Sequence, residues 1–78
     1  MKITIVYNGI PKEFDASGDE TVGSLMGRAI LTYHPPQKLA AIMGFFDRAG
    51  RELQSDNTLS ASLVKDGDDL LMRPTVIR

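Results

Sequence analysis

The side chains that could carry out chemistry are few, and no catalytic or metal-binding set is spaced among them. His34 is the only histidine in the 78 residues, and there is no cysteine. A zinc site needs several nitrogen or sulfur ligands, and nucleophilic catalysis needs a serine or cysteine beside a histidine and an orienting acid. We therefore expect no catalytic residue, no metal and no cofactor. His34 precedes two prolines, which is typical of a helix end, where a histidine interacts with the helix dipole.

Three aspartates near the end of the chain raise the question of calcium. Asp66, Asp68 and Asp69 surround Gly67 in the segment "KDGDD". An EF-hand loop has a longer set of spaced ligands and closes with a glutamate, and this segment has neither. The sequence therefore favours an acidic, solvated turn.

Charge and hydropathy narrow the possible partners. Nine Lys and Arg residues nearly balance ten Asp and Glu residues, and the basic ones are scattered. This pattern indicates neither a nucleic-acid stripe nor a basic membrane surface. The longest apolar run is far shorter than the roughly 20 residues of a membrane span, and no signal-peptide core follows Met1. We expect one domain over residues 1–78. We also expect a cytoplasmic location, because a composition without cysteine suits a reducing compartment.

The chain opens with the alternation of a β-hairpin. In "MKITIVYNG" every second side chain is apolar, and Asn8-Gly9 tolerates the positive φ angles of a two-residue turn. The segment "IPKEFDA" resumes the alternation, and Pro11 and Lys12 within it indicate an edge strand. The expected apolar side of the hairpin consists of Met1, Ile3, Ile5, Tyr7, Ile10, Phe14 and Ala16.

A helix follows the hairpin. Thr21 comes after Asp19 and Glu20 and can cap its start, and His34-Pro35-Pro36 ends it. The apolar side chains between these signals recur at helical spacing: Val22, Leu25, Met26, Ala29, Ile30 and Tyr33.

The second half alternates short elements with turns. We expect a helical turn after Pro36, a strand over about 43–47, a turn at 48–50 and a short strand at 52–54. Thr58 then caps a short turn carrying Leu59 and Leu63, and "LLMRP" forms the last strand.

The order of these elements is that of the β-grasp, and the chain resembles ubiquitin. The resemblance rests on "AGREL" at 49–53, on "NTLSASLV", on Pro35-Pro36 after the helix and on "DLLMRP". It implies an α+β fold with a mixed four- to five-stranded sheet packed on one main helix. The chain is most similar to the small ubiquitin-like proteins of bacterial operons. This implies a modifier or modifier-type protein of a conjugation-like system, with no enzymatic activity. Its implied partners are an activating enzyme, a conjugating enzyme and a JAB-type peptidase.

The C-terminal tail departs from this family. A conjugated modifier ends in two glycines because its backbone must pass through a narrow channel, whereas this sequence ends in Thr75, Val76, Ile77 and Arg78. This pattern indicates either a non-conjugated relative or a chain cut short of its tail. If Arg78 is the natural end, we expect no thioester when this chain meets ATP and an activating enzyme. A non-conjugated β-grasp adaptor and a self-assembling structural subunit remain alternatives.

Two surfaces are candidates for protein contacts. If Ile3, Ile5 and Phe14 face the helix, the opposite face of the sheet carries apolar groups in a domain too small to cover them. Phe46 and Leu71 resemble positions around ubiquitin's hydrophobic recognition patch, with Arg73 where that patch has a further aliphatic residue. The predicted interaction patch consists of Val6, Phe46, Leu71 and Arg73. A possible second contact surface is the helix ridge of Gly23, Gly27 and Leu31.

Overall fold

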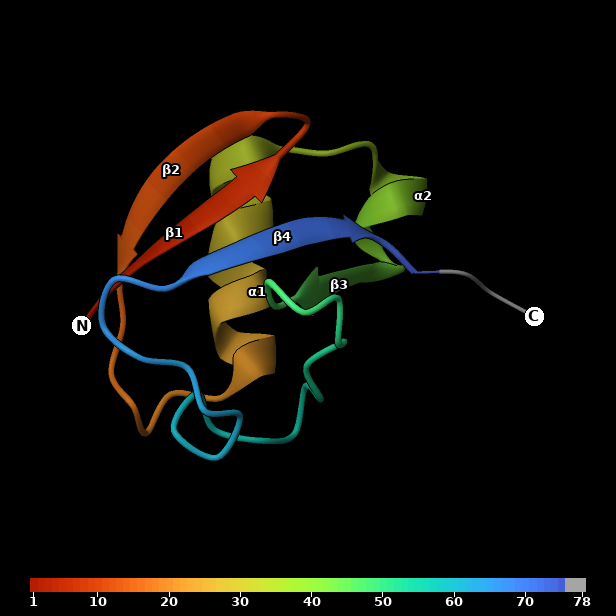
Figure 1. Cartoon of the computed structure of the whole chain (residues 1–78). Coiled ribbons are helices and arrows are strands. Elements are labelled where there is room, and N and C mark those ends of the chain that lie inside the picture. Colours follow the sequence, from red (N-terminus) through yellow and green to blue (C-terminus); the bar gives the residue numbers. More distant parts are fainter. Residues whose placement is uncertain (76–78) are drawn as a thin grey trace.

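A four-stranded mixed sheet packs on one main helix (Figure 1). The computed structural model describes residues 1–75. Strands β1 and β4 are parallel, whereas β1 pairs with β2 and β3 pairs with β4 in antiparallel fashion. The sheet order is β2-β1-β4-β3, so that β2 is an edge strand, as predicted. The elements are β1 (Lys2–Tyr7), β2 (Ile10–Asp15), α1 (Val22–Tyr33), α2 (Gln37–Ala40), β3 (Met43–Phe46) and β4 (Asp69–Pro74).

Local sequence signals account for the hairpin turn and for both ends of α1. Asn8 and Gly9 have φ angles of 52° and 76°, as a two-residue hairpin turn requires. The Thr21 hydroxyl accepts a hydrogen bond from the Ser24 N–H at 3.1 Å. His34 adopts a left-handed conformation at φ 52° and closes the helix C-terminus. These predictions are confirmed.

The core lies between α1 and one face of the sheet. Alternation along β1 buries Ile3 and Ile5 completely, and Phe45 of β3 is equally inaccessible. The remaining core side chains come from the end of β1, from β2 and the residue after it, from α1, from β4 and from the segment between β3 and β4. They are Tyr7, Phe14, Ala16, Val22, Leu25, Ala29, Leu59, Val64, Leu70 and Met72.

Ile10 lies on the core side of the hairpin by register, as predicted, since it pairs with the buried Tyr7, but it does not join the core. Its side chain is 54% exposed. Ile10 is the first residue after the hairpin turn, and α1 ends at Tyr33. The Tyr33 hydroxyl donates to the Ile10 carbonyl oxygen at 2.6 Å, so that the last residue of α1 contacts the backbone of Ile10 while its side chain stays exposed.

The predicted short strand at 52–54 is reduced to one bridge. Glu52 pairs with Phe46 in an isolated antiparallel bridge, and the Leu53 N–H donates to the Phe45 carbonyl at 2.9 Å. The Ser55 carbonyl then accepts the Gly23 N–H at 3.0 Å. This bond draws the chain away from β3 toward the start of α1, so that residues 52–54 do not extend the sheet.

Candidate functional site

The register of the sheet aligns three predicted patch residues in one row. Val6 of β1 pairs with Leu71 of β4, and Leu71 pairs with Phe46 of β3. Directly paired residues share a face of the sheet, and their chain neighbours Ile5, Leu70 and Phe45 are buried on the other face. The structure therefore places Val6, Leu71 and Phe46 together on the outer face, away from α1.

Arg73 lies over one end of this row. Its guanidinium carbon is 4.1 Å from the centre of the Phe46 ring, within cation–π distance. Arg73 is exposed, whereas Phe46 is half-buried. The contact orients the aromatic ring and puts a positive charge at the margin of the apolar row.

A shallow groove follows the row. It has a volume of about 310 Å³, and Val6, Phe46 and Leu71 line it together with a pair of charged residues. These are Arg48 and Asp69, whose Nη2 and Oδ2 atoms are 2.7 Å apart. The hydrogen bond and charge of Asp69 raise the pKa of Arg48 above its ordinary value. An apolar centre with a charged margin is the usual anatomy of a protein interface.

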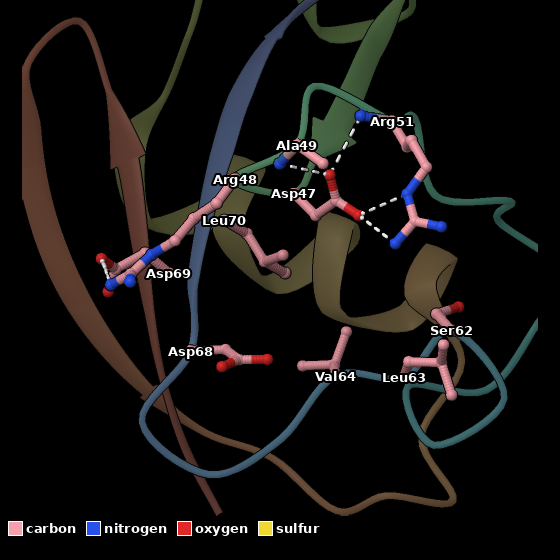
Figure 2. A pocket seen from close by; sticks show the side chains of 10 residues that line it. All are labelled: Asp47, Arg48, Ala49, Arg51, Ser62, Leu63, Val64, Asp68, Asp69 and Leu70. Carbon is pink, nitrogen blue, oxygen red and sulfur yellow. Dashed lines mark hydrogen bonds and ion pairs between the residues drawn. The ribbon is translucent and has the colours of Figure 1, made fainter.

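A second pocket lies beyond the Arg48–Asp69 ion pair. Figure 2 shows it between the 47–51 turn and residues 62–64, and its volume is about 250 Å³. Sequence reasoning missed this pocket because its walls come from two irregular segments that only the folded chain brings together. The sequence offered one local sign of this pocket, the spacing of Asp47 and Arg51, which are four residues apart in a turn.

Asp47 organises the 47–51 turn. Its Oδ1 accepts the N–H groups of Ala49 at 2.9 Å and Arg51 at 3.0 Å, and its Oδ2 lies 3.1 Å from the Arg51 guanidinium. The Arg51 N–H bond lowers the pKa of Asp47, aided by the charge of Arg51 and the bond from Ala49. The carboxylate form therefore stabilises the turn.

Replacing this carboxylate should change the acid sensitivity of the fold. A lowered pKa contributes stability that is present above the ordinary value of 3.8 and is lost as the pH falls through the folded-state value. We expect Asp47→Asn to be less stable than wild type at neutral pH and to approach wild type below pH 3.8. Urea midpoints between about pH 2.5 and 7 measure this difference. A gap independent of pH would show that the charge of Asp47 does not contribute.

The residues weighed as metal ligands have other roles. The Asp66 Oδ1 accepts the Lys2 N–H at 2.6 Å, and Asp69 pairs with Arg48. Within residues 1–75, no group of three histidine, cysteine or acidic side chains is arranged to hold a metal ion. In the same range, no helix has the length and hydropathy to cross a membrane.

Comparison with solved structures identifies the fold. Ubiquitin of Caldiarchaeum subterraneum superposes with a TM-score of 0.79 at 26% identity, covering 99% of this chain and 95% of that one. The chain has a ubiquitin-like fold. The N-terminal ubiquitin-like domain of the 4931431F19Rik protein has a TM-score of 0.81 at 14% identity, covering 100% of this chain and 77% of the other. ATBAG1, solved in complex with HSP70, has a TM-score of 0.83 at 17% identity, covering 99% of this chain and 41% of that one.

The sequence alone carries a weaker signal. No family model and no curated protein matched it. The structural neighbours named as ubiquitin and as a ubiquitin-like domain confirm the predicted β-grasp class. Neither name is that of an enzyme, in agreement with the prediction that this chain is not one.

The three residues of the possible second surface on α1 differ in the space around them. A Cβ atom on Gly23 would lie 3.3 Å from the Ser55 carbonyl oxygen, so that there is little room for a side chain at this half-buried position. Gly27 has open space around it, and Leu31 is 72% exposed. Ser55 therefore limits the space at Gly23, whereas Gly27 and Leu31 are open, and the second contact surface stays a prediction.

The two glycines should respond differently to a methyl group. We expect Gly27→Ala to stabilise the domain by about 0.5–1 kcal/mol, because alanine favours the helix and meets no neighbour. Gly23→Ala should gain less, since its methyl group presses on Ser55. Urea denaturation measures the stability of both variants, and sedimentation measures whether their mass in solution changes through self-association. A weaker self-association of Gly27→Ala would instead indicate a contact at this position.

The predicted tail lies mostly outside the described residues. Thr75 is anchored, since its N–H and hydroxyl donate to the Ile42 carbonyl oxygen at 2.7 and 2.9 Å. Val76, Ile77 and Arg78 fall beyond residues 1–75. The expectation about thioester formation therefore stays a prediction.

Proposed function

We propose that this chain is a ubiquitin-like modifier-type protein that partner proteins bind through the outer face of its sheet. The observation that supports this proposal most directly is the row of Val6, Leu71 and Phe46 across three strands, with Arg73 stacked on the Phe46 ring. The proposal places it in the cytoplasm of a bacterial cell, with an activating enzyme, a conjugating enzyme and a JAB-type peptidase as partners.

The exposure of the row supports a recognition role. Leu71 is 41% exposed at its centre, flanked by two half-buried apolar side chains. These three side chains are not part of the hydrophobic core, which lies on the opposite face of the sheet. A groove of this size suits a small, transient interface in which one or two apolar anchors dominate the affinity.

Capture from the native cell tests the recognition role. Immobilised wild type should retain partners that Leu71→Arg loses. Leu31→Arg is the matched control, because it makes the same change at an exposed leucine on α1. Loss with Leu31→Arg alone would move the binding surface to the helix and would overturn the proposal.

Intact mass distinguishes a modifier from an adaptor. Higher-mass covalent adducts of the protein in its native cell would support the modifier role. Complexes that dissociate in denaturant, with the free mass alone remaining, would support the non-conjugated adaptor instead.

A further inference from the structure

The pocket beyond the Arg48–Asp69 pair has the size of a single side chain. Its volume of about 250 Å³ falls below the roughly 300–1,000 Å³ of small-molecule sites. It shares the Arg48–Asp69 ion pair with the groove on the outer face, so that the two cavities are neighbours. A partner bound at the row of Val6, Leu71 and Phe46 can therefore reach into the pocket.

Among residues 1–75, one carboxylate in the pocket, that of Asp68, has no ion pair of its own, although its charge adds to that of Asp69 in raising the pKa of Arg48. Figure 2 shows the Arg51 guanidinium bonded to Asp47 and that of Arg48 bonded to Asp69, at 3.1 and 2.7 Å. The Asp68 Oδ2 accepts the Lys65 N–H at 2.9 Å. Among residues 1–75, its Oδ1 has neither a hydrogen bond nor an ion pair. The pocket therefore presents one free carboxylate oxygen to a ligand.

The remaining walls are mainly apolar, and the hydroxyl of the one polar residue among them, Ser62, donates to the Thr58 carbonyl oxygen at 3.0 Å. Val64 and Leu70 are buried, and Leu63 stands at the rim with 69% of its surface exposed. Leu63 also adopts a left-handed backbone conformation at φ 64°, which is unfavourable for a leucine. The core does not account for an exposed apolar side chain at such a position, whereas a bound aliphatic group would cover it.

We propose that this pocket receives a lysine side chain from the partner that binds the outer face, an inference that rests on the proposed function. Lysine combines an aliphatic stem with a charged end, matching Leu63, Val64 and Asp68. Arginine binds carboxylates best through two parallel hydrogen bonds, but one oxygen of Asp68 already accepts from Lys65. A single free oxygen suits the point charge of an ammonium group.

A small probe tests the pocket directly. Titration of the isotopically labelled protein with N-acetyl-lysine methylamide should shift the NMR signals of Leu63, Val64 and Asp68 saturably, with a Kd on the order of millimolar. N-acetyl-norleucine methylamide has a similar stem without the charge and should produce no saturable shifts. Equal shifts with both probes, or no saturation with the lysine probe, would overturn the proposal.

Two variants assign the effect to Asp68. Asp68→Asn should weaken binding of the lysine probe roughly tenfold or more, because the substitution removes the charge but retains an oxygen to accept the Lys65 N–H. Asp56→Asn removes an equal charge from an exposed position that does not line the pocket, and should bind as wild type. Equal affinity in wild type and Asp68→Asn would contradict the assignment.

The probe titration can fail or succeed independently of the experiment that tests the proposed function. Leu71→Ala should leave the probe titration unchanged, since Leu71 lines the groove and not the pocket. If the probe fails to bind while Leu71→Arg loses partners, only the lysine pocket is wrong. If the probe binds as expected but Leu71→Arg retains every partner, the pocket stands and the outer-face proposal falls.

Discussion

Phe45→Ala is expected to lower the free energy of unfolding by about 3–5 kcal/mol, whereas Phe46→Ala should cost less than about 1 kcal/mol. The two phenylalanines are adjacent in β3 but lie on opposite faces. Phe45 is fully buried against α1, so that its truncation leaves a cavity. Phe46 lies on the outer face beneath Arg73, where solvent fills the space.

Urea denaturation followed by far-UV circular dichroism measures this contrast. Ile5→Ala serves as a reference for core truncation, with an expected cost of about 2–5 kcal/mol. A domain of this size has a net stability of only about 4–12 kcal/mol, so that either core variant can leave the fold marginal. A cost for Phe46→Ala equal to that for Ile5→Ala would mean that the register of β3 is shifted by one residue.

The sheet and the helix were predictable because their signals are local and repeated. The alternation of "MKITIVY" and the spacing of the helix stripe each combine several residues that point to the same face. The outer-face row followed from the same alternation, once Ile3 and Ile5 were assigned to the core. Its alignment across three strands depends on the register, which the structure supplies.

The features that the sequence did not predict lie where distant parts of the chain decide the environment of a residue. The alternation of β2 cannot reveal that the Ile10 side chain stays exposed. The helix pattern likewise cannot show that the Ser55 carbonyl lies against Gly23. The pocket around Asp68 has the same origin, because its walls come from separate irregular segments.

Leu71→Ala is expected to weaken partner binding by about 10- to 100-fold, the size of effect seen at a central interface anchor. Leu71 lies in the middle of the row, paired with Val6 on one side and Phe46 on the other. Its truncation removes apolar contact area without opening a cavity in the core, so that stability should change little. Calorimetric titration with a captured partner measures the affinity, and Leu31→Ala is the control.

An unchanged affinity for Leu71→Ala would place the interface elsewhere on the molecule. The loss of affinity must also exceed the loss that a smaller folded fraction of the variant would cause. The urea midpoint of Leu71→Ala determines that fraction. Equal weakening by Leu71→Ala and Leu31→Ala, with both variants folded, would indicate that the partner also contacts α1 and would count against an interface confined to the outer face.

An NMR shift map with a captured partner tests the central claim most directly. If partners bind the outer face, the largest shifts and the strongest line broadening will cluster at Val6, Phe46, Leu71 and Arg73 across β1, β3 and β4. Residues on the exposed side of α1, including Gly27 and Leu31, will change little. Shifts centred on Gly27 and Leu31, with the outer-face row unaffected, would contradict the account.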